Sequence, residues 1–168
     1  MKRRTFLAAG ALGVAALAAG GWLRYGLRHA PPGRALDDDA RVIVAALVPA
    51  FLDGALPVHA PLRDSAIIET VGAVDAAVLG LPPSAQHELA QLFGLLGFPP
   101  ARMALGMRTA WSDAPTVEVQ AALQRWQGSR SLLLRSAYDG LHQLILAAWY
   151  ANPRAWPDIG YPGPPALS

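Results

Sequence analysis

Apolar residues recur every three or four positions along most of the chain after residue 36, and this spacing places side chains on one face of an α-helix. The first such segment starts at three aspartates, residues 37–39. They predict a helix start there, because an aspartate can cap a helix and negative charge favours its N-terminal end. The segment is expected to kink at Pro49, which removes a helical hydrogen bond, and to end at Asp53-Gly54.

Proline and glycine divide the rest of the chain into four more helical segments. The expected helices follow Pro61 as far as residue 79 and then cover residues 84–96, 101–109 and 116–151, with Ser84 and Thr116 as N-terminal caps. The last helix is expected to pause at Gly128, with Ser129 as a new cap. Few strand-forming residues are present. The pattern therefore predicts an all-α fold, a small bundle of about five helices.

Two of these helices carry distinct apolar stripes. The second helix has a single stripe, made by Ile67, Ile68, Val71, Val74, Val78 and Leu79. The last helix has two, made by Leu134, Ala137, Leu141, Leu144 and Ala148, and by Tyr138, His142, Ile145 and Trp149. Together they are wider than the ~100° stripe of an ordinary surface helix. The last helix is therefore either central in the bundle, the simpler interpretation, or in contact with another protein.

The N-terminus reads as a targeting segment. Arg3 and Arg4 are followed by Phe6 and Leu7, and residues 6–23 carry no charge. A basic start followed by an uncharged stretch is typical of an export signal. The arginine pair resembles the twin-arginine (Tat) signal that the Tat translocon recognises. The alternative is a membrane anchor, since 18 uncharged residues lie at the lower edge of a membrane span. Both interpretations place the rest of the chain in the periplasm, soluble or tethered to the inner membrane.

The sequence predicts that the chain is divided into four parts. They are a signal or anchor over residues 1–28, a proline-containing linker over 29–36, a helical domain over 37–151 and an irregular tail over 152–168. Prolines and glycines in the tail disfavour helix. Its aromatic residues can either cover the chain's own bundle or anchor a partner.

Composition and charge remove several classes of function. The net charge of +2 comes from the signal segment. From residue 29 onward the chain has nine Arg and twelve Asp and Glu, so this part is mildly acidic. Nucleic-acid binding is therefore not expected. The chain has no Cys, which excludes disulfides, iron–sulfur clusters and covalent c-type haem. Its four His do not fall at metal-ligand spacing, so no metal site is expected.

No catalytic residue is predicted. The sequence has no nucleotide-binding glycine loop, no nucleophile elbow and no zinc-protease motif. Its carboxylates are expected on solvated faces, at Asp64, Glu69, Asp75, Glu88, Glu118 and Asp139. An independent enzyme, or one that binds a cofactor itself, is therefore not expected.

The C-terminal third resembles a known family of small subunits. The similarity lies in Tyr138, Trp149-Tyr150, Asn152-Pro153, Trp156 and the segment Ile159-Gly160-Tyr161-Pro162-Gly163-Pro164, together with the leader Arg3-Arg4-Thr5-Phe6-Leu7. On these residues the chain is similar to the family called gluconate 2-dehydrogenase subunit 3. The match covers about a quarter of the chain.

The resemblance implies a non-catalytic subunit that exports and stabilises a large flavoprotein. That partner would be an FAD-containing dehydrogenase of the glucose–methanol–choline type, acting on a sugar acid, polyol or alcohol. The residues expected to contact it are Tyr138, His142, Trp149, Tyr150, Trp156, Tyr161 and Pro162. Two alternatives stay open: a stand-alone periplasmic small-molecule-binding protein, and an envelope enzyme whose site is assembled from distant residues.

Overall fold

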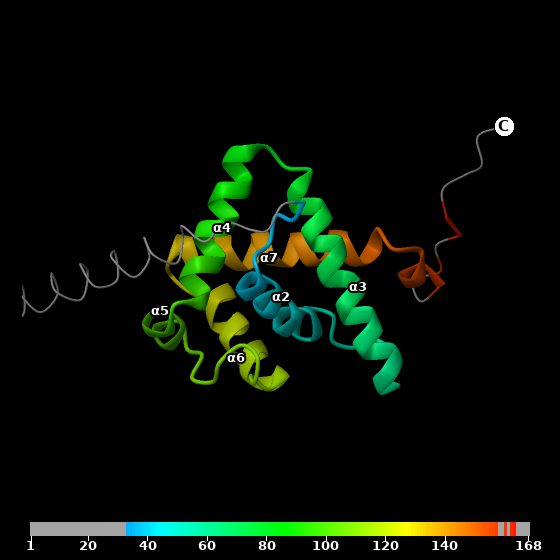
Figure 1. Ribbon diagram of the computed structural model, residues 1–168. Coiled ribbons are helices and arrows are strands. Elements are labelled where there is room, and N and C mark those ends of the chain that lie inside the picture. The colour runs from blue at the N-terminus through cyan, green and yellow to red at the C-terminus, as the bar shows by residue number, and fades with distance from the viewer. Residues whose placement is uncertain (1–32, 158–159, 161, 164–168) are drawn as a thin grey trace, which may run out of the picture.

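The structure is a computed structural model that describes residues 33–157, 160, 162 and 163. These residues form six α-helices, one turn of 3-10 helix and no strand (Figure 1), which confirms the all-α prediction. In chain order the elements are α2 (Asp38–Phe51), α3 (Ala60–Leu79), α4 (Pro83–Gly97), α5 (Pro99–Ala104), α6 (Thr116–Gln127), α7 (Leu132–Tyr150) and η1 (Pro153–Ala155). The predicted export residues Arg3, Arg4, Phe6 and Leu7 lie outside the described residues.

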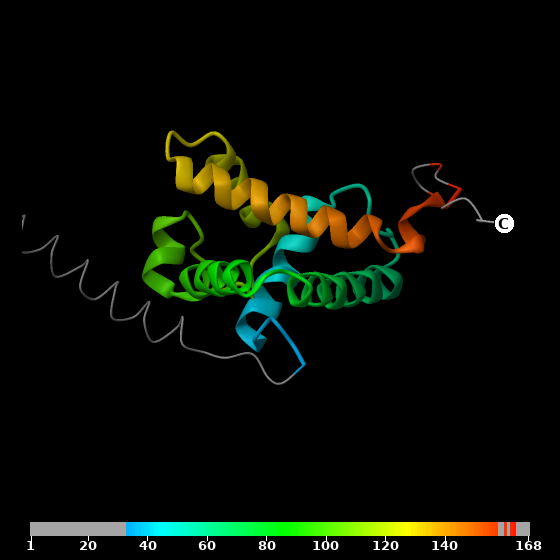
Figure 2. The ribbon, with the colours of Figure 1, turned by 90° about the horizontal axis from the view of Figure 1, so that it is seen from above.

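Helix α2 lies at the centre of the bundle. It contacts α3 and α4 on one side and α6 and α7 on the other (Figure 2). Ile43, Val44, Leu47 and Val48 are at most 1% exposed, so much of its circumference is buried. Because α2 touches four other helices, it orients the surfaces described below.

The predicted helix starts are partly right. Asp37 caps α2 as expected, since its carboxylate accepts a hydrogen bond from the Ala40 amide at 2.8 Å. The caps predicted at Ser84, Thr116 and Ser129 are wrong: Pro82, Pro115 and Ser131 hold those positions. For α4 the reason is the next residue, Pro83, whose fixed φ suits the first helical position and starts the helix before the serine.

The breaks between helices are mostly where glycine and proline predict them. The chain breaks fully after Gly128, since α6 ends at Gln127 and α7 begins at Leu132. The short helix predicted over 101–109 is displaced and runs from Pro99 to Ala104. It starts on a proline pair, which the first turn tolerates, and ends before Gly106, whose φ of +92° is left-handed.

The apolar stripe predicted on α3 is partly wrong. Val71, Val74 and Val78 are at most 5% exposed, as expected, but Ile68 is 68% and Leu79 43% exposed. At 100° per residue the last two lie just beyond the buried arc of the helix. The neighbouring helices therefore leave these two side chains at the surface.

Helix α7 packs within the bundle, against α2, α3 and α6. Leu141, Ile145, Ala148 and Trp149 are buried along it. Much of its apolar surface therefore serves the chain's own core, while exposed residues along its other side, such as Gln143 and Ala147, leave α7 at the periphery of the bundle. Leu132 and Leu133 at its start are about 70% exposed (71% and 69%).

Candidate functional site

Two of the residues predicted to contact a partner belong to an aromatic cluster. The rings of Tyr138 and His142, one turn apart on α7, stack at 5.7 Å between centroids. The ring of Phe51, at the end of α2, lies 5.6 Å from Tyr138 and 5.4 Å from His142. The three rings are half-buried. They join the C-terminal end of α2 to the middle of α7.

A third predicted contact residue lies inside the protein. Trp149 is 4% exposed and belongs to the hydrophobic core, so the expectation that it faces a partner is wrong. The reason is that α7 packs against α2, α3 and α6, and Trp149 shares the buried face of α7 with Ile145 and Ala148. Tyr150, the next residue, is turned outward and is 39% exposed.

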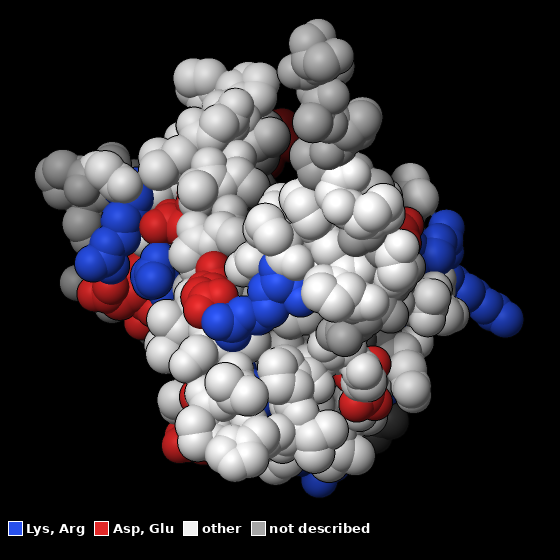
Figure 3. Space-filling model, turned by 90° about the vertical axis from the view of Figure 1, so that its right-hand side faces the viewer, with Lys and Arg blue, Asp and Glu red and all other residues white. Residues whose placement is uncertain are grey.

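The first part of the tail folds onto the chain's own bundle. The Trp156 indole donates to the Tyr150 carbonyl at 2.9 Å, and Arg154 forms an ion pair of 3.1 Å with Glu69 on α3. The Asn152 side chain accepts from the Arg154 amide and begins the turn η1, although no helical turn was expected here. Figure 3 views this end of the molecule and shows charged groups scattered over a mostly uncharged surface. Pro162 is exposed, and Tyr161 lies outside the described residues.

The sequence predicts Asp75 on a solvated face, and this prediction is wrong. Asp75 is 8% exposed, and its Oδ1 accepts from the amides of Ala35 and Leu36 at 2.9 and 2.8 Å. Its Oδ2 pairs with Arg41 of α2 at 3.0 Å. The burial arises because the segment before α2 lies against α3. Asp75 thus connects α3 to the segment before α2 and to α2 itself.

Glu118, at the start of α6, likewise connects two segments through hydrogen bonds. Its carboxylate accepts from the Thr109 hydroxyl at 2.7 Å and from the amides of Arg108 and Thr109 at 2.6 and 3.1 Å. These bonds lower the pKa of Glu118 below its ordinary value, and the Thr109 hydroxyl has a larger effect than the two amides. The charged form therefore holds the loop after α5 against α6.

An apolar hollow of about 220 Å³ lies between α2 and α3. We call it the α2–α3 hollow, and its lining is Arg41, Val42, Ala45, Ile67, Ile68 and Val71. Val42 and Ile68 are 41% and 68% exposed. The only charged group in the lining, Arg41, is already paired with Asp75. Sequence reasoning missed this surface because it assigned Ile68 to the core.

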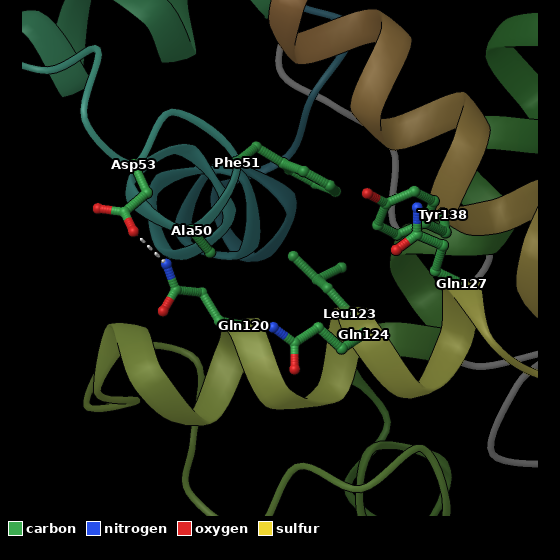
Figure 4. Close-up of a pocket in the computed structure, with 8 residues that line it drawn as sticks. All are labelled: Ala50, Phe51, Asp53, Gln120, Leu123, Gln124, Gln127 and Tyr138. Atoms are coloured by element: carbon green, nitrogen blue, oxygen red, sulfur yellow. Dashed lines mark hydrogen bonds between the residues drawn. The ribbon is translucent and has the colours of Figure 1, made fainter.

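A second depression, of about 330 Å³, is mostly polar (Figure 4). We call it the α2–α6–α7 groove, and it is lined by Ala50, Phe51, Asp53, Gln120, Leu123, Gln124, Gln127 and Tyr138. The Gln120 amide donates to Asp53 at 3.1 Å across it. The sequence does contain a signal for this site, since three glutamines at i, i+4 and i+7 share one helix face.

The described part of the chain has no group of three or more His, Cys, Asp and Glu side chains that could hold a metal ion. Within the same residues, no helix combines the length and the hydropathy that a membrane span needs. No protein-family model, no curated protein and no solved structure matches this chain.

Proposed function

We propose that this chain is the non-catalytic small subunit of a periplasmic, FAD-dependent dehydrogenase of the glucose–methanol–choline type. In this proposal the chain supplies the twin-arginine signal and stabilises the flavoprotein, which holds the FAD and oxidises a sugar acid, polyol or alcohol. The assembled complex is soluble in the periplasm or tethered to the inner membrane by the N-terminal segment.

Two parts of the sequence support the proposal. The Arg3-Arg4 leader is typical of a route that exports folded proteins, which suits a partner loaded with FAD before export. The C-terminal segment carries the resemblance to gluconate 2-dehydrogenase subunit 3. The residues that support the proposal belong to an export signal and to a segment expected to contact the partner, and none of them is a catalytic group.

The observation that carries the proposal is the α2–α3 hollow. Contact sites between proteins are often apolar and contiguous, whereas single exposed aliphatic side chains are ordinary surface features. Val42 and Ile68 border such a depression from two helices, and Ala45 and Val71 line it. An apolar side chain from a partner would bury these groups, and the hydrophobic effect would favour the complex.

The first experiment is affinity purification of the tagged, full-length chain from its native envelope, with a visible spectrum of the product. The expected result is a stoichiometric large partner with bound flavin. A colourless, monomeric chain would overturn the proposal. Arg3→Lys with Arg4→Lys is expected to keep the flavoprotein out of the periplasm, because the translocon reads the arginine pair.

A surface variant tests the hollow itself. Ile68→Lys is expected to weaken the partner complex by about 10-fold or more, because a central contact would become an unpaired buried charge. Val117→Lys is the matched control, since Val117 is 71% exposed on α6 and does not line the hollow. Both side chains face water, so both variants should remain folded. Equal binding by the two variants would exclude the hollow as the contact.

A further inference from the structure

The α2–α6–α7 groove has a lining that differs in chemistry from the α2–α3 hollow. Among the residues that line it, Asp53 carries the only charge expected at neutral pH. No Lys or Arg is in that lining, so an anion would meet a carboxylate and no compensating cation. The groove is therefore suited to a neutral ligand.

Hydrogen-bonding groups line one side of the groove. Gln120, Gln124 and Gln127 project from one face of α6, and each amide offers both donors and an acceptor. The bond from Gln120 to Asp53, 3.1 Å long, fixes the orientation of that amide. Adjacent donors and acceptors of this kind match a row of hydroxyl groups, since each hydroxyl also donates and accepts.

An apolar surface faces these amides. Phe51 is half-buried and is among the residues that line the groove. In Figure 4 the buried side chain of Leu123, which is 4% exposed, lies between the Phe51 ring and α6 and supports the ring from below. The contacts of Phe51 with Tyr138 and His142 hold the ring in place, so binding would require little ordering of this wall.

From this combination we propose that the α2–α6–α7 groove binds the pyranose ring of a neutral sugar. The apolar face of the sugar packs against the part of Phe51 that lines the groove, and its hydroxyls bond to the Gln124 and Gln127 amides. The volume of about 330 Å³ lies at the lower end of the range for small-molecule sites and suits one sugar ring. The site does not depend on the flavoprotein partner, because all of its groups belong to this chain.

The test is a titration of the ¹⁵N-labelled full-length chain with glucose, followed by the side-chain amide signals of the three glutamines. A small ligand in an open groove should bind in the millimolar range, so the titration extends to about 50 mM. Shifts confined to Gln120, Gln124 and Gln127 are expected. Glucuronate, which has the same ring with an added carboxylate, should bind more weakly because its charge lies near Asp53.

Two variants complete the test. Gln124→Ala should weaken glucose binding about 3- to 10-fold through the loss of hydrogen bonds. Gln143→Ala should not, because Gln143 is exposed on α7 and is not among the residues that line the groove. The inference is overturned if the glutamine signals do not move, if glucuronate binds as well as glucose, or if both variants behave alike. No flavoprotein is present, so this outcome is separate from that of the pull-down.

Discussion

Asp75 offers the sharpest test of how this chain holds the segment before α2 in place. Its carboxylate accepts from two backbone amides that lie 40 and 39 residues earlier in the chain, and it pairs with Arg41. Asp75→Ala removes the acceptor for all three groups. Asp75→Asn keeps an oxygen that can accept from both amides and removes only the charge. The two variants therefore separate the hydrogen bonds from the ion pair.

The expected magnitudes follow from burial. Breaking a fully buried pair costs about 3–5 kcal/mol, and an unsatisfied buried donor costs about 1–3 kcal/mol. The side chain of Asp75 is 11% exposed, but that of Arg41 is 29% exposed and can turn to water, which reduces the loss. We expect Asp75→Ala to lower the free energy of unfolding by about 3 kcal/mol and Asp75→Asn by about 1 kcal/mol. A typical domain has about 5–15 kcal/mol in total.

Urea unfolding followed by circular dichroism measures both values, and hydrogen exchange at Ala35 and Leu36 locates the effect. Asp64→Ala is the control, because Asp64 is exposed on the same helix and should change stability by less than about 0.5 kcal/mol. The reasoning is refuted if Asp75→Ala behaves like this control. It is also refuted if Asp75→Asn is as damaging as Asp75→Ala, since the amides would then contribute nothing.

Two further predictions concern α6. Because the pKa of Glu118 in the folded chain lies below its ordinary value of 4.5, its bonds stabilise the fold above about pH 4.5. This contribution is lost as the pH falls through the lowered pKa, and acid titrations of Glu118→Gln should lack that part of the loss. Trp126 is 1% exposed and donates to the Leu105 carbonyl at 2.9 Å. Thermal or urea unfolding should show a loss of about 1 kcal/mol for Trp126→Phe and about 3–5 kcal/mol for Trp126→Ala, and similar values for both would contradict this assignment.

The features that the sequence predicted well depend on local interactions. The cap at Asp37 requires only an amide three residues away, and the break after Gly128 requires only a residue that disfavours helix. The spacing of apolar residues was also sufficient for the core valines of α3. These features follow from the 3.6-residue period and from backbone preferences, which act over a few residues.

The features that it missed depend on which elements meet. Nothing near Asp75 in the sequence indicates that Ala35 and Leu36 lie against it. Trp149 and Tyr150 are adjacent aromatic residues at the end of the same helix, yet only the first is buried by the bundle. Ile68 continues an apolar stripe and is nevertheless exposed, because the stripe is wider than the surface that the neighbouring helices cover. Helical spacing indicates which residues share a face, but the packing of the other helices determines how much of that face is buried.

The two proposed surfaces can be tested separately on one chain, because α2 holds them apart. Val42 borders the hollow and Phe51 forms a wall of the groove, nine residues later on the same helix. At 1.5 Å and 100° per residue, their Cα atoms are about 14 Å apart and their side chains point to opposite sides of the helix. Substitutions separated by more than about 7–10 Å usually have additive effects. Ile68→Lys should therefore leave glucose binding unchanged, and Gln124→Ala should leave the partner complex unchanged, so a variant that abolished both would indicate unfolding.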